Sequence, residues 1–213
     1  MTQWQRAYVV HQRHFSDSRY WVDLITQYAG RVTLIWRKNK KMPPLIPFTP
    51  YSVSWDKRGE FRVLSGCEAE SAPITLQGKA LFCGFYVNEL CERLLPQDED
   101  SSIPFNAYEK VIHGLFQGDQ LEQPLREFEW QLICHLGFEF SFTHLGFNNE
   151  PICSHKRYQF NPRAGFELAQ DSAGYLGVDL ISLSRGAWND ELSRIAKVIF
   201  RRAIQSRLGA KPL

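Results

Sequence analysis

The chain lacks the features of membrane-spanning and exported proteins. None of its 213 residues lie in an apolar run near the roughly 20 residues that a membrane-spanning helix needs. Residues 1–6 contain no charged segment followed by an apolar core, which excludes a secretory signal. Its five cysteines are odd in number, widely spaced and without a C-x-x-C pair, so free thiols in a reducing compartment are the simplest interpretation. We therefore expect a cytoplasmic protein.

The sequence also lacks the short motifs of the common catalytic classes. It contains no G-x-S-x-G, H-E-x-x-H, Walker A or G-x-G-x-x-G pattern. A thiol hydrolase would need a histidine within hydrogen-bond reach of its cysteine, but Cys134 and His135 are adjacent and point in different directions on a helix. No zinc-site spacing is matched by Cys134, His135, His144, Cys153 and His155. We expect no enzymatic activity, no cofactor and no metal.

What the sequence does have is an uneven distribution of charge. Lysine and arginine outnumber acids 11 to 4 in residues 1–66, whereas acids outnumber bases 12 to 4 in residues 67–130. Residues 131–213 carry 10 bases and 7 acids, so the formal net charge of +2 conceals three different segments. A polyanion should be attracted to the first of these segments.

The basic segment is patterned as short β-strands. Runs rich in β-branched and aromatic residues occur at 7–10, 19–26, 31–37, 49–55 and 61–65. A turn at Asp56–Gly59 joins the last two runs as a hairpin. Five short strands within about seventy residues are typical of a small OB-type barrel, one face of which binds oligonucleotides.

Beyond this segment the pattern changes to that of helices. We expect helices at 79–95, 106–117 and 124–136. Residues 138–187 form an irregular insert with β-like runs at 138–142 and 175–183. The fold class is therefore α+β, with an OB-fold, DNA-binding domain over residues 1–75 and a mainly α-helical domain over residues 76–213.

A last helix is expected after Asn189, whose side chain is suited to capping it. One face of this helix is apolar and comprises Leu192, Ile195, Ala196, Ile199 and Ala203. Its other faces carry Arg194, Lys197, Arg201 and Arg202.

A group of cations in the first segment is suited to neutralising phosphates. The candidate DNA-binding residues are Arg31, Arg37, Lys38, Lys40, Lys41, Lys57, Arg58 and Arg62. Four aromatic residues near them are candidates for stacking on unpaired bases: Tyr20, Trp21, Trp36 and Tyr51. The alternative is that the cations only solvate loops and the aromatic side chains fill the barrel core.

A second candidate site lies in the third expected helix. Arg126 and Trp130 are one turn apart, beside the apolar stripe of that helix. A guanidinium next to an apolar groove is suited to binding a chain-terminal carboxylate while an aromatic ring fills the groove. The alternative is a surface pair of Glu122 with Arg126 and a half-buried tryptophan.

Several segments, in order along nearly the whole chain, resemble the RecO family of bacterial recombination and repair mediators. The most specific of them are P-F-T-P at 47–50 and Y-V-N-E-L at 86–90 followed by Arg93-Leu94-Leu95. The others are G-R-V-T-L at 30–34, P-L-R-E-F-E at 124–129, H-L-G-F at 135–138, T-H at 143–144 and L-G-A-K-P-L at 208–213.

The resemblance implies an N-terminal OB-fold on a helical domain, binding to single- and double-stranded DNA, and annealing of complementary strands. It also implies partnership with RecR and with the C-terminal tail of the single-stranded-DNA-binding protein SSB, which assists RecA loading indirectly. Arg126 and Trp130 match the positions that contact the SSB tail. The family therefore implies a nucleoid-associated role in DNA repair.

Two departures from the family pattern affect these expectations. Residues 145–148 offer no cysteine pair where many members bind zinc, so this chain is expected to be zinc-free. The basic loop at 37–42 is shorter than usual. The alternative function is a protein–protein adaptor whose OB-like barrel has lost DNA binding.

Overall fold

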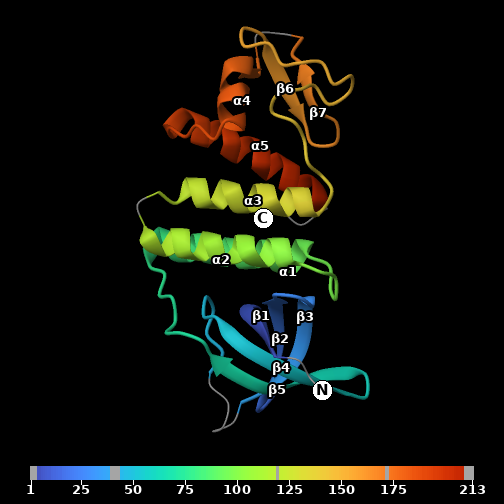
Figure 1. Ribbon diagram of the computed structural model, residues 1–213, viewed down its shortest axis with the longest axis vertical. Coiled ribbons are helices and arrows are strands. Elements are labelled where there is room, and N and C mark those ends of the chain that lie inside the picture. Colours follow the sequence, from blue (N-terminus) through green and yellow to red (C-terminus); the bar gives the residue numbers. More distant parts are fainter. Residues whose placement is uncertain (1–3, 39–43, 119, 171–172, 209–213) are drawn as a thin grey trace. The chain divides into compact units, whose positions relative to one another are not determined.

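The structure, a computed structural model, describes residues 4–38, 44–118, 120–170 and 173–208. The chain forms two compact units, Met1–Leu125 and Arg126–Leu213 (Figure 1). The boundary between them falls inside helix α3 (Glu122–His135). Each unit has its own core and is described separately.

The first unit begins with a closed five-stranded barrel. Its strands are β1 (Gln5–Ser16), β2 (Arg19–Thr26), β3 (Gly30–Arg37), β4 (Tyr51–Arg58) and β5 (Phe61–Ala69). They are hydrogen-bonded in the order β1-β2-β3-β5-β4, with β1 and β4 closing the barrel and β3 parallel to β5. This order and size confirm the expected OB-like barrel and the α+β class.

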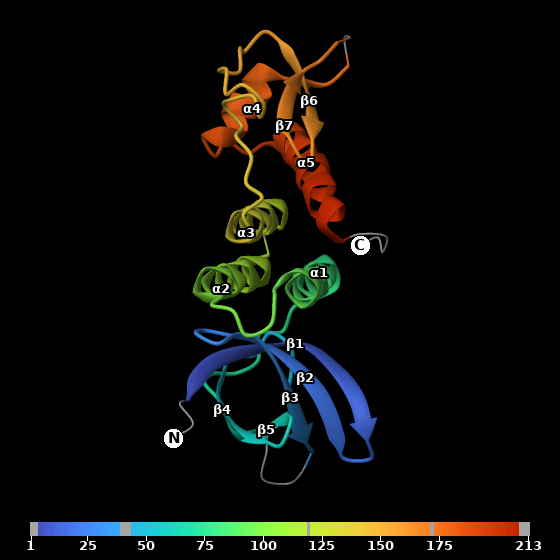
Figure 2. The ribbon, with the colours of Figure 1, turned by 90° about the vertical axis from the view of Figure 1, so that its right-hand side faces the viewer.

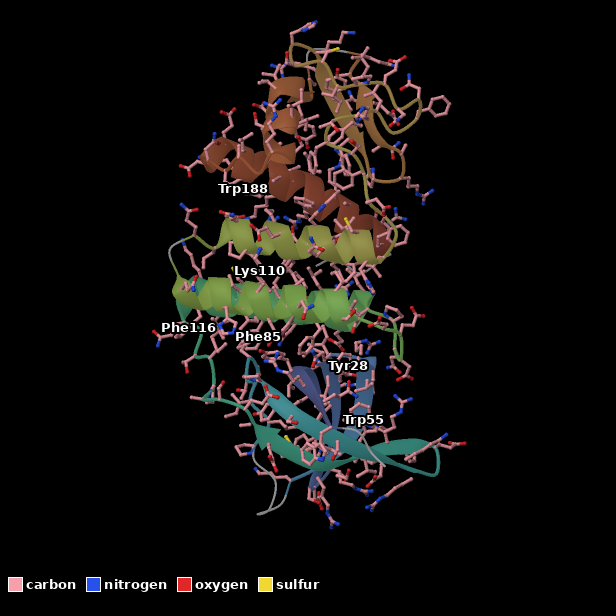
Figure 3. The ribbon with its side chains drawn as sticks, in the orientation of Figure 1. Tyr28, Trp55, Phe85, Lys110, Phe116 and Trp188 are labelled. Carbon is pink, nitrogen blue, oxygen red and sulfur yellow. The ribbon has the colours of Figure 1, made fainter. Side chains whose placement is uncertain are left out.

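The barrel interior follows the alternation of each strand. Small and branched apolar side chains such as Val22, Leu24, Val32 and Leu34 point inward and are buried. Trp36 and Tyr51 also belong to this core, and Tyr20 and Trp55 pack against it (Figure 3 labels Trp55). For Trp36 and Tyr51 the alternative to base stacking, that they fill the barrel core, is therefore confirmed, because they point inward on β3 and β4.

Two helices of the same unit lie over one end of the barrel (Figures 1 and 2). They are α1 (Gly78–Leu94) and α2 (Ser102–Gln117), and Asn88 and Tyr108 join them by a buried hydrogen bond of 2.8 Å. Glu89 and Arg93, one turn apart on α1, form an ion pair at 2.8 Å. Asn88 therefore interrupts the apolar pattern of α1 because its side chain accepts a hydrogen bond from the Tyr108 hydroxyl.

The P-F-T-P segment packs on helix α1 immediately before the Y-V-N-E-L segment. Phe48 of P-F-T-P is buried with a positive φ of 62° and packs on Phe85 of α1, with 5.6 Å between ring centroids (Phe85 is labelled in Figure 3). Gly84 gives this ring its space, since a Cβ there would lie 2.8 Å from the Phe48 ring. A bulky residue in the left-handed region persists only where its surroundings hold it, and this packing does so.

Ionic groups fasten the helices to the barrel. Arg6 on β1 donates to Glu109 of α2 at 2.6 Å and to Glu70 at 2.8 Å, and the Tyr8 hydroxyl donates to Glu109 at 2.9 Å. Burial and the Glu109 hydrogen bond raise the pKa of Tyr8 far above its ordinary value. The acids of residues 67–130 thus neutralise part of the basic segment within the same chain.

The second unit continues from α3 through a small three-stranded sheet to two helices. Its elements are β6 (Arg157–Asn161), β7 (Gly165–Leu168), β8 (Tyr175–Leu176), α4 (Gly177–Ser184) and α5 (Asp190–Leu208). As predicted, Asn189 caps α5 by accepting from the Leu192 amide at 2.8 Å. Within the described ranges, no helix combines the length and apolarity needed to cross a membrane.

Of the two β-like runs expected in this unit, the one at 138–142 is wrong, and the one at 175–183 is right only for Tyr175–Leu176, which form β8. Residues 177–184 form helix α4, and a short apolar run such as V-D-L-I-S-L does not distinguish strand from helix. Residues 138–142 form no strand; Phe140 and Phe142 instead join an aromatic core. Strands β6 and β7 lie within 157–168, a segment that the sequence pattern left irregular.

Candidate nucleic-acid interface

The outer surface of the barrel carries a short row of aromatic side chains. Trp21 points outward on β2, because its neighbours Tyr20 and Val22 face the core. Trp21 contacts Phe15 of β1 on one side and Phe61 of β5 on the other, with centroid separations of 5.2 and 5.6 Å. Phe15 is 42% exposed and Phe61 is 48% exposed. We call Phe15, Trp21 and Phe61 the aromatic strip.

The floor beneath the strip is apolar and regular. Trp21 is directly opposite Ile35 of β3, and Ile35 is in register with Val63 of β5. Paired residues in adjacent strands point to the same face, so the strip spans four strands, β1, β2, β3 and β5. The β1–β2 hairpin extends away from α1 and α2 (Figure 2), which leaves this part of the barrel wall uncovered within the first unit.

Each ring of the strip has an arginine as a neighbour. The Arg19 guanidinium lies 5.0 Å from the centre of the Phe15 ring, and its Nε donates to Ser16 Oγ at 3.0 Å. Arg13 is opposite Trp21 in the β1–β2 ladder, and Arg58 is opposite Phe61 in the β4–β5 ladder. Arg13 and Arg58 are exposed. Arginine beside an open aromatic ring suits a ligand with both phosphates and bases.

Two further predicted cations lie at the Arg19 end of the strip. Arg37 is opposite Arg19 in the β2–β3 ladder, and the Lys38 amide donates to the Ser18 carbonyl at 2.8 Å. Lys57 is exposed on β4 next to Arg58.

Four arginines therefore lie along the strip or at its Arg19 end. We call Arg13, Arg19, Arg37 and Arg58 the strip cations. Lys40 and Lys41 lie outside the described residues.

Acids limit the positive surface around the strip. Asp56 is in register with Val63 on the same outer face, and the buried Asp23 carboxylate lies 3.7 Å from Arg13. Asp17 is exposed in the turn between β1 and β2, next to the Arg19 end, so acids reduce the positive field at both ends of the strip.

Two of the predicted cations have other partners. Arg31 lies at the opposite end of β3 from Arg37; its Nε donates to the Leu95 carbonyl at 2.8 Å, and its side chain is only 14% exposed. Arg62 forms a bidentate pair with Asp98, and this hydrogen bonding raises the pKa of Arg62. Both side chains bind the segment that follows α1, so neither belongs with the strip cations.

The strip includes residues that sequence reasoning missed. None of Phe15, Phe61, Arg13 and Arg19 was a candidate: Arg13 and Phe15 follow the expected strand at 7–10, and Arg19 and Phe61 are the first residues of their expected strands. One available signal is the alternation R-Y-W-V-D-L in residues 19–24, which puts Arg19 and Trp21 on the face opposite the buried Val22 and Leu24.

The second candidate site, Arg126 and Trp130 of α3, differs from the expectation that both side chains lie beside the core. The Arg126 side chain is 5% exposed and pairs with Glu129 at 3.0 Å, one turn along α3. Trp130 contacts the rings of Phe140, Phe142 and Phe200 of the second unit. Arg126 is therefore a buried, ion-paired side chain rather than an exposed guanidinium beside a groove.

The structure gives no support to Cys134 as a nucleophile or to a metal site among the described residues. Burial, with a contribution from Glu139, raises the pKa of the Cys134 thiol, which is the opposite of the shift that activates a nucleophile. No group of three or more histidines, cysteines and acids in the described part of the chain is placed to hold a metal ion.

Comparison with known proteins connects this geometry to a family. The family model described as the N-terminal part of recombination protein O matches residues 1–72, and the model of its C-terminal part matches residues 76–212. The "DNA repair protein RecO" of Serratia proteamaculans is 35% identical over 100% of this chain and 91% of its own length.

Two further relatives agree with this match. Those of Hamiltonella defensa and Cellvibrio japonicus, both named "DNA repair protein RecO", are each 34% identical over at least 98% of this chain. The matched regions cover 94% and 93% of the lengths of these two relatives. Two family models that together span almost all 213 residues, with relatives of this identity, show that the chain belongs to the RecO family.

Proposed function

We propose that the protein is a non-catalytic, DNA-binding mediator of recombination and DNA repair, acting in the cytoplasm at the nucleoid. Its barrel binds single-stranded DNA across the aromatic strip, with bases on Phe15, Trp21 and Phe61 and phosphates on the strip cations. The observation that carries this proposal is the row of half-exposed rings, each with an arginine beside it. A solvated loop would not need exposed aromatic side chains.

The same surface accounts for strand annealing without a chemical step. Complementary strands repel each other through their phosphates, and a protein that neutralises them lowers that repulsion. Double-stranded DNA offers phosphates but no free base faces, so it binds the strip cations without stacking. We propose weaker, more salt-sensitive binding of duplex DNA than of single strands.

Family membership supports three protein partners. The chain acts with RecR, contacts the C-terminal tail of SSB, and so helps to load RecA onto SSB-coated DNA. In the second unit, the tail carboxylate replaces Glu129 as the partner of Arg126 and its terminal aromatic ring packs beside Trp130. The burial of the Arg126–Glu129 pair makes this exchange a requirement of the proposal.

One observation favours a different function, a protein–protein adaptor with a barrel that does not bind DNA. Arg6, Arg31 and Arg62 of the basic segment are all bound by groups of the same chain. The positive field of the barrel is therefore weaker than its composition indicates.

Fluorescence anisotropy with labelled single-stranded DNA separates the two functions. If the four strip cations contact phosphates, the logarithm of the binding constant should fall with the logarithm of salt concentration with a slope of about −3. The measurement is a titration at several salt concentrations between about 50 and 200 mM. A flat salt response, or no binding at the lowest salt concentration, would leave the adaptor as the better account.

The peptide site has its own test. Arg126→Ala should weaken the binding of an acidic peptide ending in phenylalanine, while bare single-stranded DNA binds as before, because Arg126 and the strip lie on different elements. Isothermal titration with the peptide and anisotropy with DNA measure the two effects. Thermal unfolding of the variant is the control, since Glu129 loses a partner. An equal loss of both ligands in a folded variant would contradict the assignment.

A further inference from the structure

Helix α5 presents a second positive surface, in a different unit from the aromatic strip. Its buried side comprises Leu192, Ala196, Ile199, Phe200, Ala203 and Ile204. The other side is exposed and carries Arg194, Lys197, Arg201 and Arg202. We call these four residues the α5 cationic stripe.

The charge of this helix is unusually one-sided along its length. Asp190 and Glu191 occupy the first turn, where acids complement the helix dipole. From Arg194 to Leu208 the helix carries five basic residues and no acid. Within the described ranges, Arg194 and Arg201 form no ion pair with an acid. The contrast with Arg6, Arg31 and Arg62 of the barrel is direct, since each of those side chains is bound within the chain.

The stripe has a spacing that suits an extended polyanion. Arg194, Lys197 and Arg201 are three and four residues apart, so they line one side of the helix and rise about 10 Å from first to last. A phosphate chain that follows the helix therefore meets a cation at each turn. Arg202 lies beside them, over the Phe160 ring at 5.9 Å.

Arg207, one turn after the buried Ala203, lies on the packed side of α5 rather than in the stripe, and it borders a polar cavity. Arg207 stacks on Phe138, with its guanidinium carbon 3.7 Å from the ring centre, and donates to the Pro162 carbonyl at 3.3 Å. Arg207 and Arg163 both line a cavity of about 540 Å³ in the second unit. The stacking fixes the Arg207 guanidinium in place, so a phosphate that reaches it meets a preorganised donor.

We propose that the α5 cationic stripe binds the backbone of a second nucleic-acid strand. This proposal rests on the proposed function of the barrel, in which the aromatic strip binds the first strand. A membrane surface would require several apolar anchors, whereas among the described residues of α5 Val198 is the one large apolar side chain that is exposed. Each chain therefore binds two strands at once, one on each unit, which is what bringing complementary strands together requires.

The test counts the strands bound by one chain. The probe is a short labelled oligothymidine, which cannot pair with itself, and native mass spectrometry of the full chain counts the molecules bound. We expect two oligonucleotides on the unaltered chain and one on the double variant Arg194→Gln, Arg201→Gln. Glutamine keeps the helix propensity and removes two charges. The salt slope summed over both sites should also decrease by about 1.4 in magnitude.

The matched control removes the same charge from the same unit but away from the stripe. Lys156→Gln with Arg185→Gln changes two exposed cations outside α5 and should still bind two oligonucleotides. Loss of the second oligonucleotide in this control would show that net charge, not the stripe, is responsible. Two oligonucleotides on the stripe variant, or one on the unaltered chain, would overturn the proposal.

A barrel variant separates failure of this inference from failure of the proposed function. Trp21→Ala with Arg58→Gln alters the aromatic strip and leaves α5 intact. One oligonucleotide on the barrel variant and one on the stripe variant support both surfaces. Two on the barrel variant and one on the stripe variant would keep the stripe and overturn the proposed role of the barrel.

Discussion

Both units of this protein contain clusters of aromatic rings, but they use them in opposite ways. In the second unit, Phe160, Phe166 and Phe200 are at most 4% exposed, and Phe140 contacts all three rings, so that they form a closed core. In the barrel, Phe15 and Phe61 remain 42% and 48% exposed on either side of Trp21. The comparison shows that aromatic content alone does not identify a binding face; the deciding factor is whether the rings cover one another.

The positive charges of the two units differ in a similar way. The barrel segment has the larger surplus, yet Arg6, Arg31 and Arg62 hold the helices and the segment after α1 in place. The smaller surplus of the second unit is concentrated on α5. The net charge of a segment therefore overestimates what a polyanion can contact when acids of the same chain are nearby.

The largest expected effect comes from opening the closed cluster. Phe166→Ala removes a fully buried ring from the second unit and should lower the free energy of unfolding by about 3–5 kcal/mol. Denaturant unfolding followed by tryptophan fluorescence measures this loss. Phe142→Ala is the control, because Phe142 is partly exposed in the same cluster and its removal should cost less. A loss below about 1 kcal/mol would mean that the cluster is not a core.

The next effect should appear in binding rather than in stability. Trp21→Ala removes the central ring of the aromatic strip and should weaken single-stranded DNA binding by about 1–3 kcal/mol, because one base loses its stacking partner. Anisotropy with oligothymidine measures this change, and duplex DNA of equal length serves as the control because its bases are already stacked. Equal losses for both ligands would indicate that Trp21 acts through the barrel structure.

The smallest effect distinguishes paired from available cations. Arg58→Gln should reduce the salt slope of single-stranded DNA binding by about 0.7 in magnitude, because one phosphate contact is lost. Arg62→Gln should leave that slope unchanged, since Arg62 is paired with Asp98, and should cost at most about 1 kcal/mol of stability. Salt titrations of both variants make the comparison. A smaller salt slope for Arg62→Gln and an unchanged slope for Arg58→Gln would instead place the DNA on the side of the barrel that carries Asp98.

Much of the fold followed from local patterns. Short alternating runs with Gly and Asp turns predict the five strands, and the structure confirms the expected cap at Asn189 and the expected helix end at residue 117. Residues 177–184 failed because a buried apolar run has no period that separates strand from helix. Strands β6 and β7 were missed because only their mutual pairing stabilises these short segments.

The candidate site was only partly accessible to the same reasoning. The basic character of the barrel was visible, but Arg37 and Arg31 are six residues apart on one strand and lie at its opposite ends, with different partners. Phe15 was not recognised, because β-bulges near His14 and Ser16 shift the register of β1 and break the alternation there.

The sequence by itself determined the five barrel strands, the helices that follow them and the family, because strand and helix periods and specific motifs are local properties of the chain. The tertiary structure alone decided which cations are available and which rings are open. Those properties depend on contacts between residues far apart in sequence, such as Arg62 with Asp98 and Trp21 with Phe61, and no local pattern specifies such contacts.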